Sequence, residues 1–244
     1  MSGDHAVETA RETATELRRL MGDRLRVALL YGSAARGEYV EGVSDINLVA
    51  LFDDVDTTAL VAAAPHAKRM EQRRINTLVM EWADRERLSD TFCIELLDLR
   101  DACVPLIGEN PFAGAVIDGA LLRRQAERES RTRLLHLHAG MLHALADRRL
   151  FGGLLCDALP SFATYLRAAL RLAGRPVPGR MNDVISAGCD LVGAEPRGLL
   201  AAYDARMRAR PWNIELADPI VETYRAACER IVRFIDTFEG GGTE

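Results

Sequence analysis

The chain has 244 residues, a hydrophobic fraction of 48% and a formal net charge of -5 at pH 7. This length supports one large domain or two modest ones, and the acidic balance argues against a protein that mainly coats nucleic acid or an anionic membrane. Five cysteines without paired spacing favour neither a disulfide framework nor a zinc ribbon.

Charge is divided unevenly along the chain. Residues 1–110 carry 13 basic and 20 acidic side chains, whereas residues 111–244 carry 18 and 16. An acidic half can concentrate divalent cations and an arginine-bearing half can receive phosphate, although solvated surfaces give the same counts. The N-terminus lacks an apolar leader and no run of about 18 uncharged apolar residues follows, so we expect a cytoplasmic protein with no membrane partner.

The first 110 residues alternate helical and strand-like segments. Apolar residues recur with a helical period from Val7 to Met21, and a second helix-prone segment, residues 56–73, opens with an Asp/Thr cap and contains Pro65. Four runs of β-branched and aliphatic residues predict strands, at residues 25–32, 46–52, 75–82 and 91–99. The alternation favours a mixed sheet flanked by helices.

The remaining residues show only helical patterns. Residues 117–146 lack strand signals, a further helix is predicted with Ser161 as its cap, and a last one has Asp218 as cap with Pro219 in its first turn. We therefore expect an α+β protein whose residues 1–110 form the mixed sheet and whose residues 111–244 form an all-α helical bundle.

Chemistry-bearing residues gather between the first two predicted strands. Gly32 and Ser33 follow an apolar strand and precede the helix formers AARGE, so backbone N–H groups at a helix N-terminus favour an anion there, although Gly-Ser also serves simple steric turns. Asp45 and Asn47 begin the next strand two residues apart, which places their side chains on one sheet face. Oxygen atoms so placed can hold magnesium against a triphosphate.

A third carboxylate is expected from a neighbouring strand. Glu95 stands among apolar residues in the middle of the predicted strand 91–99, where a charge is costly unless it faces a polar cleft or a cation. Asp98 points the other way by strand parity and suits a cap or turn. Glu81 is a competing choice.

The runs GSAARGE and SDINL together resemble the Gly-Ser and Asp-x-Asp motif of the DNA polymerase beta-like nucleotidyltransferase superfamily. The resemblance covers residues 25–100, and the helical half is similar to helical domains that several members carry behind the catalytic one. It implies a nucleotidyltransferase-like domain in which Gly32 and Ser33 hold the nucleotide's phosphates, with Arg36 near them or bracing the turn.

The resemblance also implies a metal-dependent reaction. Asp45, Asn47 and Glu95 would bind magnesium or manganese, and Asp45 and Glu95 would be catalytic in moving AMP from ATP to a hydroxyl of a small molecule or protein. Asn47 departs from the motif, because an amide can donate its oxygen but lacks the carboxylate's charge. The alternatives are a catalytically impaired pseudo-nucleotidyltransferase that binds nucleotide or a protein, and a helical half that forms a homo-oligomer.

Two other clusters have simpler explanations. His136, His138 and His143 suggest a metal site, yet His136 and His138 face apart on a helix and no carboxylate stands three or four residues after either of them. Arginines between residues 123 and 133 could receive a triphosphate or a nucleic-acid backbone, but interspersed glutamates favour a solvated, salt-bridged face. Without interleaved aromatic residues, nucleic acid is not an expected partner.

Overall fold

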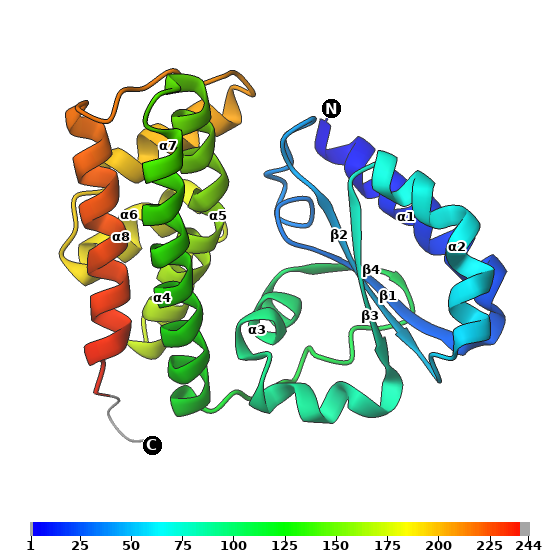
Figure 1. Ribbon diagram of the computed structural model, residues 1–244. Helices are drawn as coiled ribbons and strands as arrows, with labels where there is room; N and C mark the ends of the chain where they lie inside the picture. Colours follow the sequence, from blue (N-terminus) through cyan, green and yellow to red (C-terminus); the bar gives the residue numbers. More distant parts are fainter. Residues whose placement is uncertain (1, 240–244) are drawn as a thin grey trace. The chain divides into compact units, whose positions relative to one another are not determined.

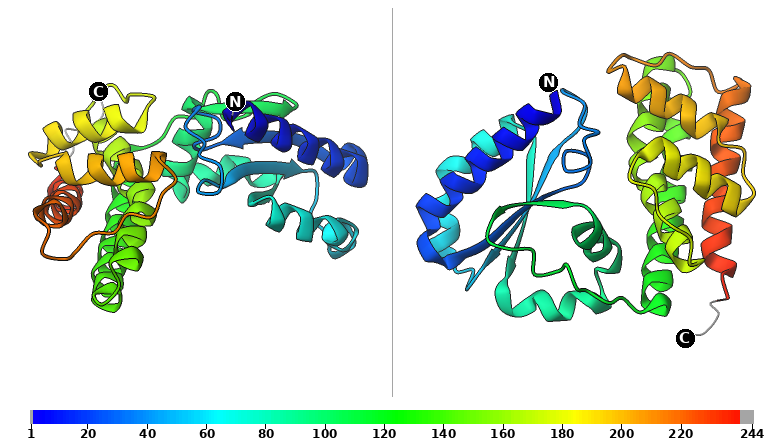
Figure 2. Two further views of the ribbon diagram at one scale, coloured as in Figure 1. Left: turned by 90° about the horizontal axis from the view of Figure 1, so that it is seen from above. Right: turned by 180° about the vertical axis from the view of Figure 1, so that it is seen from behind.

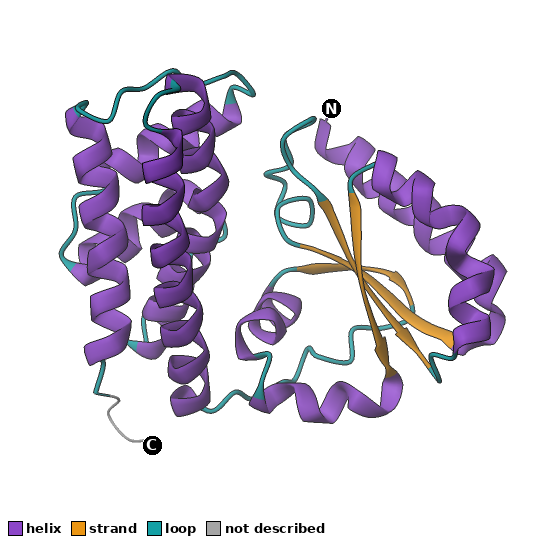
Figure 3. Cartoon of the chain, viewed as in Figure 1, coloured by secondary structure: helices purple, strands orange, loops and turns teal. Residues whose placement is uncertain are grey.

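A computed structural model describes residues 2–239 of the chain. Its contacts divide the chain into two compact units, with the boundary between Ile117 and Asp118. The first unit contains a mixed sheet with helices and the second is helical (Figure 3), which confirms the predicted α+β fold class. Within residues 2–239, none of the helices has the length and apolarity needed to cross a membrane.

The first unit is built on a four-stranded mixed sheet. Its strands are β1 (Leu25–Tyr31), β2 (Ile46–Phe52), β3 (Ile75–Glu81) and β4 (Cys103–Ile107). They are ordered β3-β2-β1-β4; β2 and β3 run parallel, and the other two pairs are antiparallel. The first three predicted strands are confirmed.

Helices cover both faces of this sheet. In the first unit α1 (Ser2–Met21) and α2 (Thr57–Gln72) lie together on one face, and α3 (Cys93–Asp101) lies on the other (Figure 1, Figure 2). Because side chains alternate along a strand, each face has its own core: Leu30 and Leu48 pack with small alanines of α1, whereas Leu29 and Val49 pack with leucines of α3. Short 3-10 helices occupy η1 (Gly22–Arg24) and η2 (Trp82–Asp90).

The predicted fourth strand is wrong. Residues 93–101 form α3, and the fourth strand is β4, which the sequence analysis did not predict. Cys93, Ile94, Leu96, Leu97 and Leu99 are all buried, so the helix is apolar on most of its circumference and shows no amphipathic stripe. A short apolar run of this kind cannot be assigned to strand or helix from its period.

A second correction concerns the segment after Gly32. The residues Ala-Ala-Arg-Gly-Glu were expected to open a helix, but residues 32–37 form hydrogen-bonded turns only. The amide of Arg36 donates to the carbonyl oxygen of Gly32 at 3.2 Å, and the amide of Glu38 donates to that of Ser33 at 2.9 Å. The hydrogen bonds span a single turn and no helix follows, so the N–H groups of this segment do not lie at a helix N-terminus.

The second unit is a bundle of helices. They are α4 (Gly119–Ala144), α5 (Arg148–Leu172), α6 (Met181–Val192), α7 (Arg197–Met207) and α8 (Pro219–Thr237). Asp218 caps α8 as predicted, its carboxylate accepting from the Ile220 amide at 2.9 Å. Ser161, by contrast, is not a cap: it lies inside α5, which begins after Asp147 and continues through Pro160.

Close backbone contacts and one buried hydroxyl hold the bundle together. Gly152 in α5 packs against the Trp212 backbone so closely that an added Cβ would lie 1.7 Å from the Trp212 carbonyl oxygen. The fully buried Tyr224 of α8 donates from its hydroxyl to the Leu155 carbonyl oxygen of α5 at 2.9 Å. Burial raises the pKa of Tyr224 well above its ordinary value, so the hydroxyl keeps its proton.

Candidate functional site

The site is built around Asn47, the second residue of β2. Asn47 is the direct cross-strand partner of Tyr31 on β1, and its side chain shares the α3 face of the sheet with Val49. Gly32 lies against it: a Cβ added to Gly32 would lie 2.9 Å from the Asn47 amide nitrogen. Gly32 also has φ +76°, a conformation that favours glycine. The turn after β1 therefore rests directly on Asn47.

A neighbouring residue that was not predicted from the sequence is Asn76. Because β2 and β3 are parallel and paired from Ile46 and Ile75 onward, Asn76 is the direct partner of Asn47 and shares its sheet face. A third carboxylate was expected from a strand next to β2. The parallel neighbour is β3, and opposite Asn47 it carries the amide of Asn76. Aligning the starts of the two apolar runs would have shown it, since each has Asn in its second position.

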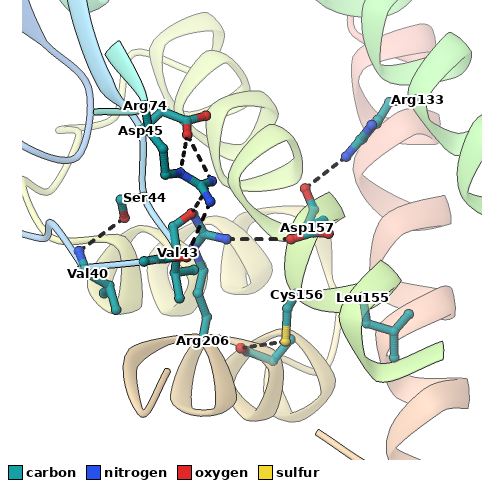
Figure 4. A network of polar contacts seen from close by, with 12 residues as sticks. Val40, Val43, Ser44, Asp45, Arg74, Arg133, Leu155, Cys156, Asp157 and Arg206 are labelled. Carbon is teal, nitrogen blue, oxygen red and sulfur yellow. Dashed lines mark hydrogen bonds and ion pairs between the residues drawn. The ribbon is translucent and has the colours of Figure 1, made fainter. Parts of the chain in front are cut away.

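Asp45 lies directly before β2, and Arg74 lies directly before β3. The Nε and Nη2 atoms of Arg74 both lie 2.9 Å from Oδ1 of Asp45. Figure 4 shows the two side chains facing each other. The same guanidinium donates to the carbonyl oxygens of Gly42 and Val43, at 3.3 and 3.1 Å. The carboxylate predicted to hold a metal is thus already bound by a cation.

Glu95 reaches the same face of the sheet from a helix rather than from a strand. It lies in the first turn of α3, partly buried, and Asp98 follows three residues later on the same side of the helix. The strand-parity argument that separated these two acids is therefore wrong. The pKa of Tyr31 is raised, first by burial and then by the negative charges of Glu95 and Asp98. The two acids and the tyrosine thus belong to one electrostatic cluster.

Arg36 has a structural partner. Its Nη2 lies 2.9 Å from Oδ1 of Asp98, and the two side chains are only 9% and 16% exposed. This ion pair ties the turn after β1 to α3. It favours the prediction that Arg36 braces the turn over the prediction that it contacts phosphate.

The remaining candidates lie elsewhere or are engaged in ion pairs. Glu81 is at the far end of β3, where it pairs in register with Phe52 and accepts from the Val55 amide at 3.2 Å. On α4, His138 lies 3.8 Å from Glu229, and the arginine run forms ion pairs such as Arg131 to Asp236 at 2.8 Å. Those pairs are typical of a solvated, salt-bridged surface.

The predicted metal ligands do not fit a two-metal centre in this arrangement. Asp45 is paired with Arg74, Asn47 contributes a neutral amide, and Glu95 stands on α3 beside Tyr31. No group of three His, Cys, Asp or Glu side chains that could hold a metal ion occurs in the described part of the chain. Carboxylate oxygens are preferred ligands of divalent cations, and the positive charge of Arg74 beside Asp45 opposes a cation there.

The fold of this chain is similar to that of a solved adenyltransferase. A similar solved structure is that of the spectinomycin adenyltransferase AAD(9) from Enterococcus faecialis with ATP and spectinomycin. Its TM-score is 0.58 at 13% sequence identity, over 91% of this chain and 98% of that chain. At that identity the likeness is one of fold.

A second solved structure aligns less well. The STING-associated CdnE c-di-GMP synthase from Capnocytophaga granulosa has a TM-score of 0.32 at 11% identity, over 96% of this chain and 81% of that chain. A score of this size supports no argument. No protein-family profile and no curated protein sequence matches the chain.

Proposed function

We propose that the chain binds a nucleoside triphosphate at the turn formed by residues 32–38, and that its capacity for nucleotidyl transfer is strongly reduced. The observation that carries this proposal is the pair of amides, Asn47 and Asn76, side by side at the starts of β2 and β3. The fold supports nucleotide binding, since the similar spectinomycin adenyltransferase was solved with ATP. This is the catalytically impaired alternative among the predictions from sequence.

The reduced activity follows from charge. Phosphoryl chemistry with metals depends on carboxylates that hold the cations in place, and an amide contributes an oxygen without a charge. A loss of about 3–5 kcal/mol of transition-state stabilisation corresponds to a rate roughly 100-fold to several thousand-fold slower. Because Asn47 and Asn76 are both amides, neither β2 nor β3 supplies such a charge at this position.

Calorimetric titration with ATP tests the binding half of the proposal. We expect saturable binding that Ser33→Glu abolishes, because a carboxylate in the turn repels the triphosphate. Ser186→Glu, on the exposed side of α6, is the matched control and should leave binding unchanged. If ATP does not bind, or if both variants lower the affinity equally, the turn is not a nucleotide site.

The catalytic half needs a separate measurement. Transfer of labelled AMP from ATP, in magnesium or manganese and with cell extract as a source of acceptors, is expected to be slow. The double variant Asn47→Asp/Asn76→Asp should increase it, since it places two carboxylates side by side on neighbouring strands. Rapid transfer by the natural chain, with no gain in the double variant, would show that the amides do not limit the reaction.

Glu95 supports a second candidate, the magnesium- or manganese-dependent nucleotidyltransferase itself. Burial first, and then the Glu95 carboxylate, raise the pKa of Tyr31, the strand partner of Asn47, so Glu95 acts on the same face of the sheet. In this candidate Asp45 and Glu95 are catalytic, the nucleoside monophosphate is AMP, and the acceptor is a hydroxyl of a small molecule or a protein. Label transfer that Glu95→Gln removes, while ATP still binds, would favour it.

A further inference from the structure

Arg74 holds the segment before β2 through its side chain and its backbone. The guanidinium contacts Asp45 and the carbonyl oxygen of Val43 (Figure 4). It also donates to the carbonyl oxygen of Gly42. The carbonyl oxygen of Arg74 also accepts from the Ile46 amide at 2.9 Å. Arg74, directly before β3, thus holds residues 42–46, the segment that leads into β2.

The backbone of Arg74 is unusual. Its φ is 55°, in the left-handed region that side chains other than Asn, Asp and Gly seldom adopt. Its own amide donates to the Glu71 carbonyl oxygen at 3.0 Å, which ends α2 and turns the chain into β3. The residue is therefore held in an unfavourable conformation that aims its guanidinium at Asp45.

The charge of Asp45 is balanced by the protein. Asp45 and Arg74 are one anion and one cation, and the neighbouring Asn47 and Asn76 are neutral. Arg73, the next arginine, is engaged with Glu12 at 3.1 Å rather than with Asp45. A guanidinium presents several N–H donors in a plane and binds phosphate as readily as carboxylate. The Arg74 side chain is 48% exposed, so part of it remains accessible to a ligand.

We propose that Arg74 is a built-in counter-ion for Asp45 that excludes divalent metal from this site, and that it contacts the triphosphate in the metal's stead. ATP would then bind without magnesium. The second part of this inference rests on the proposed nucleotide binding. The first part does not, because exclusion of a metal can be measured without any nucleotide.

Manganese binding, followed by electron paramagnetic resonance in nucleotide-free buffer, tests the exclusion. The background is Asn47→Asp, which provides a second carboxylate next to Asp45. Adding Arg74→Asn should tighten manganese binding at least about tenfold, since a unit positive charge some 5 Å from a dication opposes it by about that factor even in water. Asparagine tolerates the left-handed backbone, and Arg74→Gly is a second variant that does so.

Arg73→Asn in the same background is the matched control and should leave the manganese affinity within about threefold. Equal manganese affinity with and without Arg74, in both the Asn and Gly variants, would overturn the exclusion. A similar gain from the Arg73 change would do so as well, because it would show only a general effect of charge.

ATP titration of the natural chain, in EDTA and in magnesium, tests the contact with the triphosphate. We expect affinities that agree within about threefold, and a loss of at least about tenfold in EDTA for Arg74→Asn. ATP binding that requires magnesium would overturn metal-free recognition. If ATP binds under neither condition, the proposed function fails, and the manganese measurement still decides whether Arg74 excludes the metal.

Discussion

The guanidinium of Arg36 lies 2.9 Å from the carboxylate of Asp98, and both side chains are largely closed to solvent. The pair joins the turn that covers Asn47 to the helix that carries Glu95. The ion pair thereby fixes the turn after β1 against α3, although the two segments are far apart in the chain.

Arg36→Ala should lower the free energy of unfolding by about 3–5 kcal/mol, because Asp98 loses its cation in a poorly solvated position. The double variant Arg36→Met/Asp98→Leu should lose less than Arg36→Ala alone, since no charge remains. Urea denaturation measures both. Arg73→Ala, which breaks an exposed pair with Glu12, is the control and should change stability by less than about 1 kcal/mol. Equal losses at Arg36 and Arg73 would contradict a structural role for the buried pair.

Gly32→Ala tests the contact between the turn and Asn47. Gly32 and Gly37 both have positive φ, +76° and +73°, so alanine should destabilise at either position by about 1–2 kcal/mol. At Gly32 the new methyl group also pushes on the Asn47 amide, whereas at Gly37 it meets nothing within 4 Å. We expect similar unfolding free energies for the two variants in urea but weaker ATP binding for Gly32→Ala alone. Equal ATP affinity would show that the amide is not part of the site.

Because the pKa of Tyr31 is raised, we expect the free energy of unfolding to depend on pH in the alkaline range. Burial, then Glu95 and Asp98, raise its pKa above the ordinary value of 10.0, so the folded chain holds the phenolic proton more tightly than the unfolded chain. Its contribution is complete below pH 10 and is lost as the pH rises from 10 through the raised pKa. Urea denaturation at a series of pH values should show a steeper decline for the natural chain than for Tyr31→Phe. Parallel curves would contradict a raised pKa.

Two adjacent glycines of α5 give a matched test of the bundle. Gly152→Ala would place a methyl group 1.7 Å from the Trp212 carbonyl oxygen and should destabilise by about 3 kcal/mol. Gly153→Ala meets nothing within 4 Å and should stabilise by about 0.5–1 kcal/mol, because alanine is the better helix former. Thermal unfolding of both variants gives the comparison, and equal effects would be inconsistent with the packing described.

The sequence predicted correctly those elements whose formation depends on residues close together in the chain. The period of α1, the Asp218 cap of α8 and the first three strands depend on neighbours within a few residues, and all were predicted. α3 was mistaken for a strand because its leucines are buried on most sides, a property of the surrounding sheet rather than of the segment. Ser161 was mistaken for a cap because proline usually marks a boundary, whereas α5 continues through Pro160.

The candidate site divides in the same way. Gly32, Ser33, Asp45 and Asn47 stand within sixteen residues, and strand alternation alone predicted that the last two share a face. Glu95 was chosen from an incorrect strand, yet it acts on Tyr31 because α3 packs on the face that carries Asn47. Asn76 was missed because its importance depends on the register between β2 and β3, whose paired residues lie 29 positions apart in the chain. Hydrogen bonds between the strands set that register.

The alternation of apolar and polar residues and the short turn motif are properties of consecutive residues. They were sufficient to predict the α+β fold and to propose a place for the site. The partner of each polar group in that site is not determined by consecutive residues. The pairing of Asp45 with Arg74 and of Asn47 with Asn76 arises only when β2 and β3 align in register, since that alignment decides which charges and amides become neighbours. The electrostatic character of the site is therefore a consequence of the folded sheet.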